Sequence, residues 1–317
     1  MTAYCQSQTD SNLYESPQKF TMATLDGYIV RDRENNRNIP IFIRYPKEAS
    51  GQLPLILWSH GGGPKDTGKY QNREWGQLLA ESGYIVIHMS HLERSRAEAN
   101  ALYREFNLSP RQGQRAFSTL EVDRPRDATA VLNNLDAIEK TFPEIAGKID
   151  RDRVGVAGHS FGSYTAMLMG GARATLTEEF ADLSFKHPLP KAILALSPQG
   201  PGRFGFEEDS WRELNLPVMS ATGAADETPG EVPEDRVMPF SLMPPGEKYL
   251  FFINDEDADH ATFNLGNKQH PEFSKWLGAA GVAFFDSALK NSAEARAYLV
   301  SGTTEAISNN VASIRSR

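Results

Sequence analysis

Six short apolar runs, each separated from the next by helical or loop sequence, constrain the fold of this chain most strongly. They are almost continuously hydrophobic, as in LPLILW and YLFFIN, which is typical of strands buried on both faces of a sheet. Two earlier runs alternate more and flank the charged turn 31–37, which predicts an antiparallel hairpin. The eight predicted strands are Thr24–Val30, Pro40–Tyr45, Leu53–His60, Tyr84–Met89, Arg153–Gly158, Lys191–Ser197, Pro217–Thr222 and Lys248–Asn254.

Helical stretches lie between the later strands, and their alternation with the strands predicts an α/β fold. We expect a mostly parallel eight-stranded sheet with helices on both faces. A polar, flexible leader over residues 1–20, a single domain over 21–300 and a polar C-terminal tail over 301–317 complete the predicted organisation. The four predicted helices are Tyr70–Glu81, Arg124–Lys140, Phe161–Met169 and Pro271–Lys290.

One connection, residues 92–123, is much longer than the usual loop between elements. It is rich in arginine and poor in apolar positions. Connections of this length are usually functional or mobile. Two interpretations stay open, a solvated excursion and a cap or wall over the functional site.

Charge and cysteine content narrow the class of protein. The 317 residues carry a net charge of −8, which provides no general attraction for phosphate backbones, so we expect no nucleic-acid partner. The one cysteine, Cys5, cannot close an internal disulfide and lies in the leader, away from any site in the fold. The leader lacks a signal-peptide pattern and no apolar run reaches membrane-spanning length, so we expect a cytoplasmic protein without integral membrane association. A secreted protein without its signal has the same appearance.

The sequence Gly158-His159-Ser160-Phe161-Gly162 follows a predicted strand and precedes a predicted helix. This is the context of the G-x-S-x-G elbow, a sharp turn that exposes a nucleophilic serine. The glycines let the chain pack closely at the turn, and the helix N-terminus favours developing negative charge. A helix N-cap serine after a glycine turn is the alternative. We predict that Ser160 is the nucleophile.

A second glycine-rich turn, His60-Gly61-Gly62-Gly63, follows the third predicted strand. Acyl transfer needs two backbone N–H groups aimed at the tetrahedral oxyanion. One is expected from Phe161, the residue after the nucleophile, and the other from the loop after the third strand. Gly62 is the first choice for this second donor and Gly63 the next. His60 is expected to anchor the loop by hydrogen bonds.

A general base and its orienting acid must follow the serine in the order Ser, Asp or Glu, His. His260 comes after the last predicted strand and is the predicted base, with His270 as the alternative. The acid is expected after the preceding strand, where the chain reads TGAAD, which selects Asp226. In the triad mechanism the base takes the serine proton and the acid fixes the imidazole tautomer. The alternatives for the acid are Glu227, Asp255 and Asp259.

No metal and no cofactor are expected at this site. The chain has no HExxH motif and no cysteine cluster. The acidic stretch 255–259 lacks the glycine and the terminal glutamate of a calcium loop. We therefore interpret it as a solvated turn.

In this order, the motifs WSHGGG, VAGHSFGSYTA, TGAAD and DADHATF resemble those of α/β hydrolases related to dienelactone hydrolases. They are most similar to bacterial relatives of platelet-activating-factor acetylhydrolase. The resemblance spans about residues 24–290 and implies the α/β-hydrolase fold, with an oxyanion hole at Gly62 and Phe161 and a triad of Ser160, Asp226 and His260. Two positions depart from the pattern: Ser163 replaces a second glycine after the elbow, and the cysteine nucleophile of dienelactone hydrolases proper is missing.

The predicted function is hydrolysis of carboxylic esters, with short or medium acyl groups or small aromatic groups, through an acyl-enzyme on Ser160. The substrate is a small-molecule ester, and the protein is expected to be a monomer or a homodimer. The loop after the sixth predicted strand is expected to contact the substrate, unless its aromatic residues simply pack the loop. The predicted substrate-binding residues are Gln199, Phe204, Phe206 and Trp211.

Other functions stay open at this stage. One is a polyester hydrolase of the PET-degrading, cutinase-like kind or a phospholipid-type hydrolase, although the loop 197–200 lacks the cleft tryptophan of polyester hydrolases. An amidase or peptidase uses the same triad, and a non-catalytic ligand-binding relative keeps the fold without the chemistry. Anionic substrates would suit the arginines of residues 92–123.

Overall fold

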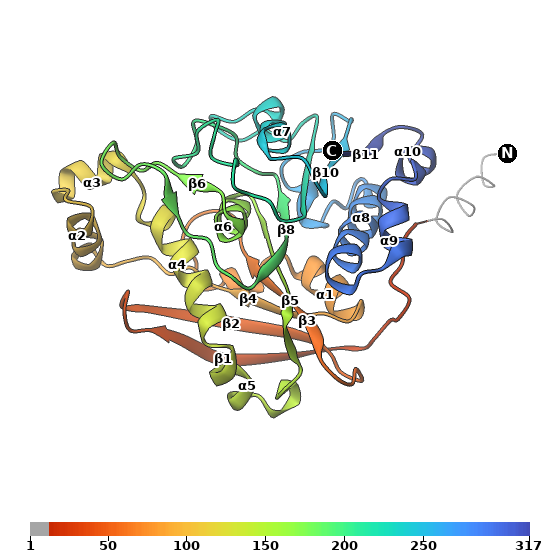
Figure 1. The fold of residues 1–317 in the computed structure, drawn as a ribbon, viewed down its shortest axis with the longest axis horizontal. Coiled ribbons are helices and arrows are strands. Elements are labelled where there is room, and N and C mark those ends of the chain that lie inside the picture. Colours follow the sequence, from red (N-terminus) through yellow and green to blue (C-terminus); the bar gives the residue numbers. More distant parts are fainter. Residues whose placement is uncertain (1–12) are drawn as a thin grey trace.

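The structure, a computed structural model, describes residues 13–317 as an α/β arrangement around one large sheet (Figure 1). The strand order is β1-β2-β4-β3-β5-β8-β9-β10-β11. Neighbouring strands from β4 to β10 run parallel, whereas the pairs β1–β2, β2–β4 and β10–β11 are antiparallel. The strands are β1 (Met22–Asp32), β2 (Arg37–Pro46), β3 (Leu53–Ser59), β4 (Ile85–Met89), β5 (Ile149–His159), β8 (Pro190–Leu196), β9 (Val218–Gly223), β10 (Lys248–Ile253) and β11 (Ala312–Ser316).

The sheet has nine strands where the sequence predicted eight. All eight predicted strands are present, with ends shifted by a few residues. The ninth, β11, lies in the segment expected to be a polar tail and follows the short helix α10 (Thr303–Ile307). It pairs with β10 through its backbone, with Ile314 opposite Phe251. The sequence ASIRS contains no apolar run because an edge strand is buried on fewer sides than a central one.

Side chains of β3 alternate between two apolar layers, as a pleated strand requires. Leu55 and Leu57 face the cluster that contains residues of α4 (Thr119–Asn133) and α6 (Phe161–Gly170). Ile56 and Trp58 face the other cluster, which contains residues of α1 (Arg73–Glu81) and α8 (Pro271–Lys290). The expected parallel sheet with helices on both faces is therefore confirmed.

The first residues of the chain divide into two parts. Residues 1–12 of the predicted leader, including Cys5, lie outside the described residues. Tyr14 is buried, and its hydroxyl donates a hydrogen bond of 2.8 Å to Asp286 Oδ2 on α8. Part of the predicted leader therefore packs on the domain.

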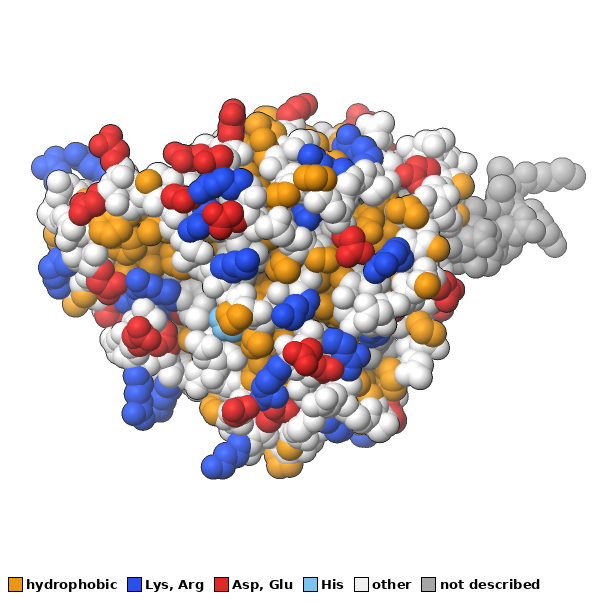
Figure 2. Space-filling model, in the orientation of Figure 1, with side chains coloured by type: hydrophobic (Ala, Val, Ile, Leu, Met, Phe, Trp, Pro, Cys, Tyr) orange, Lys and Arg blue, Asp and Glu red, His pale blue; other side chains and the backbone are white. Residues whose placement is uncertain are grey.

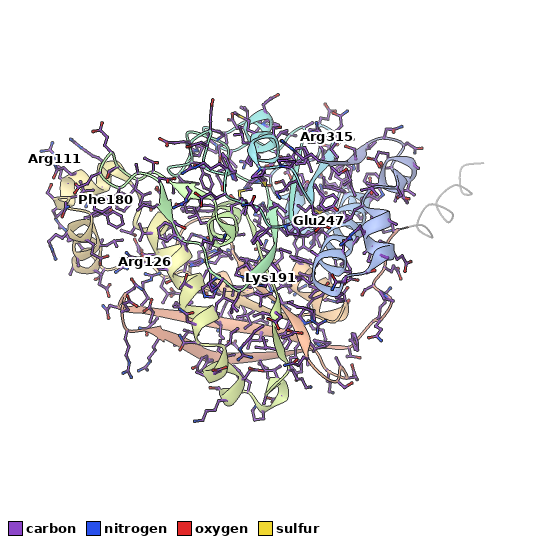
Figure 3. All side chains as sticks on the ribbon, viewed as in Figure 1. Arg111, Arg126, Phe180, Lys191, Glu247 and Arg315 are labelled. Atoms are coloured by element: carbon purple, nitrogen blue, oxygen red, sulfur yellow. The ribbon has the colours of Figure 1, made fainter. Side chains whose placement is uncertain are left out.

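The long connection 92–123 is mostly helical. It contains α2 (Arg96–Glu105), α3 (Pro110–Ala116) and the start of α4, and each helix begins with a capping box. Its apolar side chains join a small separate cluster, in which the rings of Phe106 and Phe180 lie 4.8 Å apart. Arg111 lies at the outer edge of the molecule (Figure 3). The charged composition reflects the exposed faces of these short helices.

Helix α4 begins at Thr119, five residues before the predicted start, and continues through Pro125. Proline has no N–H, so the carbonyl of Glu121 loses its partner inside the helix. The Tyr164 hydroxyl of α6 donates to that carbonyl at 3.1 Å. This bond ties α4 to α6 beside the elbow. The predicted helix over 124–140 is in fact α4 followed by α5 (Leu135–Thr141).

Two further helices and a short hairpin complete the fold. The helix α7 (Pro233–Leu242) follows β9, and α9 (Ala293–Tyr298) follows α8. Two short antiparallel strands, β6 (Arg173–Ala174) and β7 (Leu183–Ser184), follow α6. Basic and acidic side chains are interspersed over the face in Figure 2. Among residues 13–317, no helix combines the length and the apolar character needed to cross a bilayer.

Candidate active site

Ser160 lies in the sharp turn between β5 and α6. Its φ of 54° and ψ of −124° are unusual for a residue with a side chain and cost about 1–3 kcal/mol. Neighbouring bonds hold this conformation: Ser160 N–H donates to Leu196 O at 2.9 Å, and Ser163 Oγ donates to Ser160 O at 2.7 Å. The Ser160 side chain is partly exposed at the surface.

Both glycines of the elbow are required by close backbone packing. A Cβ on Gly158 would lie 2.3 Å from the carbonyl carbon of Gly162. A Cβ on Gly162 would lie 2.0 Å from Ser59 O on β3. Because these neighbours are backbone atoms, they cannot rotate away. The glycine pattern is therefore explained by the tight contact between the elbow and β3.

Ser160 and His260 line the same pocket, which has a volume of about 660 Å³. Their side chains form no hydrogen bond to each other in the described structure; such bonds often tighten only when substrate binds. No residue of 92–123 lines this pocket, so its placement favours a solvated excursion over a cap. The other lining residues are Gly61, Gly62, Lys65, Tyr70, Gln71, Asn72, Arg73, Glu74, His159 and Asn264.

His260 and Asp226, from the loops after β10 and β9, form a close pair. His260 Nδ1 lies 2.7 Å from Asp226 Oδ1, and Thr222 Oγ1 donates to Asp226 Oδ2 at 2.8 Å. A backbone bridge between Ala225 and Asp259 joins the two loops one residue away from this pair. The structure therefore brings together the two residues that the sequence selected as acid and base.

Asp226 is held in its ionised form. Burial alone would raise the pKa of Asp226, but the hydrogen bond with His260 and the charge of Arg236 outweigh it and lower this pKa below its usual value. Arg236 is fully buried, with Nε 3.1 Å from Asp226 Oδ1 and 2.8 Å from Asp226 O. Since an ionised carboxylate only accepts hydrogen bonds, the proton is assigned to His260 Nδ1, which leaves Nε2 free to act as a base.

Two of the alternatives, His270 and Asp259, have other partners. His270 contacts Asp257 Oδ2 at 3.1 Å and Glu272 Oε1 at 3.2 Å, and it does not line the Ser160 pocket. Asp259 Oδ1 accepts from Thr262 N at 3.0 Å. The geometry therefore favours His260 over His270 as the base.

His159, the residue before the predicted nucleophile Ser160, is a supporting residue that the sequence did not single out. Its Nε2 lies 2.9 Å from His260 O, an acceptor, so this nitrogen donates. Burial, with the nearby His260 as a smaller cause, lowers the pKa of His159 to about 3, so the ring is neutral at ordinary pH. His159 therefore fixes the backbone at His260 without adding charge.

Of the predicted oxyanion donors, Phe161 follows Ser160 in the chain and Gly62 lines the same pocket as Ser160. Phe161 is the first residue of α6, so its N–H has no partner within the helix. Gly62 has a φ of 70° and lines the pocket, whereas Gly63 does not line it. His91 N–H donates to His60 Nε2 at 3.2 Å, and the opposite ring nitrogen lies 2.8 Å from Gly61 O. His60 thus anchors the loop, as its position suggested.

The predicted substrate-binding residues lie in two environments. Phe204 is partly exposed and stacks on Phe161 with ring centroids 4.2 Å apart. Phe206 and Trp211 are buried in the core, and Gln199 is buried with Oε1 accepting from the Ser163 hydroxyl. Burial contradicts direct substrate contact for these three, and ordinary packing describes them better. Apolar side chains in a loop look the same in sequence whether they line a pocket or fill the core.

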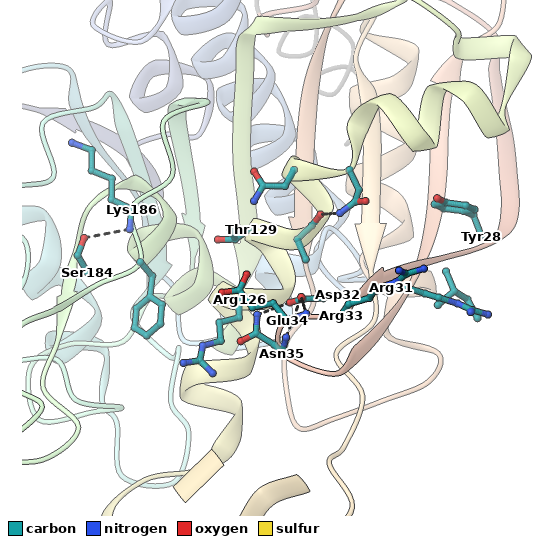
Figure 4. Close-up of a pocket in the computed structure, with 15 residues that line it drawn as sticks. Tyr28, Arg31, Asp32, Arg33, Glu34, Asn35, Arg126, Thr129, Ser184 and Lys186 are labelled. Atoms are coloured by element: carbon teal, nitrogen blue, oxygen red, sulfur yellow. Dashed lines mark hydrogen bonds between the residues drawn. The ribbon is translucent and has the colours of Figure 1, made fainter. Parts of the chain in front are cut away.

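A larger pocket of about 960 Å³ lies away from this site, between the β1–β2 hairpin, α4 and residues 184–186 (Figure 4). Arg31, Asp32, Arg126 and Lys186 are among its lining residues. The lining has no histidine, so it offers no imidazole to act as the base of a Ser-His-Asp triad. We therefore take the smaller pocket at Ser160 as the candidate active site.

Comparisons with known proteins add no assignment. No protein-family model matches the chain, and no curated protein matches it significantly. Within residues 13–317, no group of three or more His, Cys, Asp or Glu side chains is placed to hold a metal ion. The geometry around Ser160 is therefore the basis for assigning a function to this chain.

Proposed function

We propose that this chain is a serine hydrolase of the α/β-hydrolase fold that cleaves carboxylic esters. The observation that carries the proposal is that Ser160, in a strained turn, shares a pocket with His260, whose Nδ1 is paired with buried Asp226. The chain order supports it, with the nucleophile after β5, the acid after β9 and the base after β10. The likeness of the four sequence motifs to dienelactone-hydrolase relatives agrees with this assignment.

In the proposed reaction, Ser160 Oγ attacks the ester carbonyl carbon while its proton passes to His260 Nε2. The carbonyl electron pair moves to oxygen, and the resulting oxyanion accepts hydrogen bonds from the N–H groups of Phe161 and Gly62. Collapse breaks the bond to the alcohol, which takes the proton from His260. Water then attacks the acyl-enzyme by the same steps and releases the acid. Asp226 stabilises the imidazolium throughout.

The pocket lining supports small or polar esters. It contains no aliphatic side chain, and Tyr70 is its one large aromatic residue other than the histidines. A polyester or phospholipid substrate would require a broad apolar surface beside the nucleophile. The described lining gives those alternatives no support. A non-catalytic relative is also disfavoured, because all three triad positions are occupied by competent groups.

The proposal is tested with 4-nitrophenyl acetate and Ser160→Ala. We expect kcat/KM to fall by at least about 10³-fold, because a triad without its nucleophile retains only oxyanion-hole and binding contributions. Ser184→Ala is the matched control, since Ser184 lines the larger pocket, and it should leave kcat/KM unchanged. Retained hydrolysis by Ser160→Ala would show that the proposal is wrong. Esters of rising acyl length then measure how far the polar pocket limits the substrate.

A further inference from the structure

A single buried side chain, that of Arg124 on α4, binds the turn that contains Gly62. Its Nη1 donates to His60 O at 2.6 Å and its Nη2 donates to Gly62 O at 2.5 Å. Nη1 also lies 3.3 Å from Ser59 Oγ. The planar guanidinium binds both carbonyl oxygens at once through two nitrogens held in fixed geometry. The single ammonium of a lysine cannot reproduce this two-point contact.

The same guanidinium contacts the other oxyanion segment. Its central carbon lies 4.5 Å from the centroid of the Phe161 ring, in cation–π geometry. Phe161 also stacks on Phe204 and so has little freedom to turn. One side chain therefore touches both segments whose N–H groups are proposed to bind the oxyanion. Helix α4 holds that side chain in place, and the Tyr164–Glu121 bond ties α4 to α6.

Arg124 forms no direct salt bridge with a carboxylate within the described residues, although the charge of Asp127 acts on it and partly offsets the effect of burial. The adjacent acids of α4 pair elsewhere: Asp123 with Arg94 at 2.7 Å, and Asp127 with Arg37 at 2.8 Å. Arg124 is fully buried, and burial lowers its pKa to about 9, which leaves it protonated at neutral pH. A buried cation whose neighbouring carboxylates are engaged by other arginines favours negative charge that develops nearby.

We propose that Arg124 is the positioning residue of the oxyanion hole, which fixes the Gly62 turn against Phe161 and adds positive potential behind both donors. This inference rests on the proposed esterase function. Arg124 is expected to stabilise the transition state more than the bound substrate, because the oxyanion forms only when the serine attacks. Loss of Arg124 should therefore lower kcat and leave KM nearly unchanged.

Three variants separate the parts of this role. Arg124→Met removes both the charge and the two-point contact with the carbonyl oxygens of His60 and Gly62. Arg124→Lys keeps the charge but loses the two-point contact. Phe161→Leu keeps the backbone N–H and removes the ring face beneath the guanidinium. The matched control is Arg44→Met, because Arg44 is also a buried arginine over an aromatic ring, that of Phe42 at 4.6 Å.

Each variant is assayed for kcat and KM with 4-nitrophenyl acetate. Each is also assayed for inhibition by an alkyl trifluoromethyl ketone, whose carbonyl carbon is attacked by the serine to give a tetrahedral oxyanion. Removing one oxyanion donor costs about 10²–10³ in kcat, so we expect Arg124→Met to lose about 10²-fold in kcat, with KM within about threefold. Its ketone affinity should fall by the same factor. We expect Arg124→Lys to recover part of both losses and Arg44→Met to match the wild type.

The inference is overturned if folded Arg124→Met keeps kcat and ketone affinity within about threefold of Arg44→Met, or if KM alone changes. If circular dichroism shows that Arg124→Met does not fold, Arg124→Lys and Phe161→Leu decide instead: parallel losses in kcat and ketone affinity support the role, and wild-type values for both overturn it. Ser160→Ala separates this test from the proposed function. Activity that does not require Ser160 refutes the esterase proposal, whereas Ser160-dependent activity that ignores Arg124 refutes this inference alone.

Discussion

Replacing Asp226 with asparagine tests the acid of the proposed triad, because it keeps the shape of the side chain and removes its charge. His260 would lose the anion now 2.7 Å from its Nδ1, and the amide can present an N–H that selects the wrong tautomer. The same change in a serine protease triad costs about 10⁴ in kcat. Four decades correspond to about 5 kcal/mol of lost transition-state stabilisation.

Stability should fall as well, because buried Arg236 would lose its closest carboxylate. Breaking a buried ion pair costs about 3–5 kcal/mol. The lower end is expected here, since Arg236 keeps bonds to Asp226 O, Ser197 O and Thr228 Oγ1. With a typical free energy of unfolding of about 5–15 kcal/mol, the variant should stay folded at 25 °C. The lowered pKa of Asp226 means that its contribution is present at neutral pH and is lost as the pH falls below about 4.

The assay is kcat with 4-nitrophenyl acetate beside urea unfolding at pH 7 and pH 3. Asp259→Asn is the matched control, since exposed Asp259 neighbours His260 and pairs with Thr262. We expect it to leave kcat within about threefold. Asp226 is not the acid if Asp226→Asn keeps kcat within about tenfold of the wild type, or if Asp259→Asn shows the larger loss.

Three further variants test other parts of the account. Burial raises the pKa of Glu121 from 4.5 to about 7. The protonated carboxyl therefore contributes fully to stability below pH 4.5, and this contribution is lost as the pH rises through 7. Urea unfolding should show that Glu121→Gln is as stable as the wild type at pH 4 and more stable at pH 8, by up to about 3 kcal/mol. Gly162→Ala should abolish folding or activity through its backbone clash, whereas Gly266→Ala, with open space around it, should behave as wild type in melting and rate. Gly62→Ala should lower kcat because its φ of 70° strains an alanine, and an equal loss in Gly63→Ala would show that the donor was assigned to the wrong glycine.

Much of the sheet could be predicted because its central strands are buried on both faces. Their apolar runs mark the strands even without knowledge of the partners. The positions of the candidate acid and base also follow from chain order, because the carboxyl ends of parallel strands meet along one edge of the sheet. The Asp226–His260 pair was found in this way.

Features that depend on contacts between distant segments could not be predicted. Arg124 and Arg236 act through backbone carbonyls, and nothing in a sequence marks a carbonyl as the partner of a given arginine. Arg124 stood at the start of a predicted helix, just after the arginine-rich connection 92–123, and nothing distinguished it from the arginines there. Helix α7 was not predicted because its sequence contains two prolines, which usually disfavour a helix. Trp211 was expected to line a pocket, but its Nε1 contacts Met167 Sδ at 3.1 Å within the core.

The most direct test of the central claim is to locate the covalent adduct formed with a fluorophosphonate ester, which phosphonylates an activated serine and releases fluoride. Peptide mapping by mass spectrometry after complete reaction should place one phosphonyl group on Ser160, and Ser160→Ala should form no adduct. Asp226→Asn should react at the same residue but far more slowly. An adduct on another residue, or no reaction of the folded wild-type protein, would contradict the assignment of Ser160 as the nucleophile.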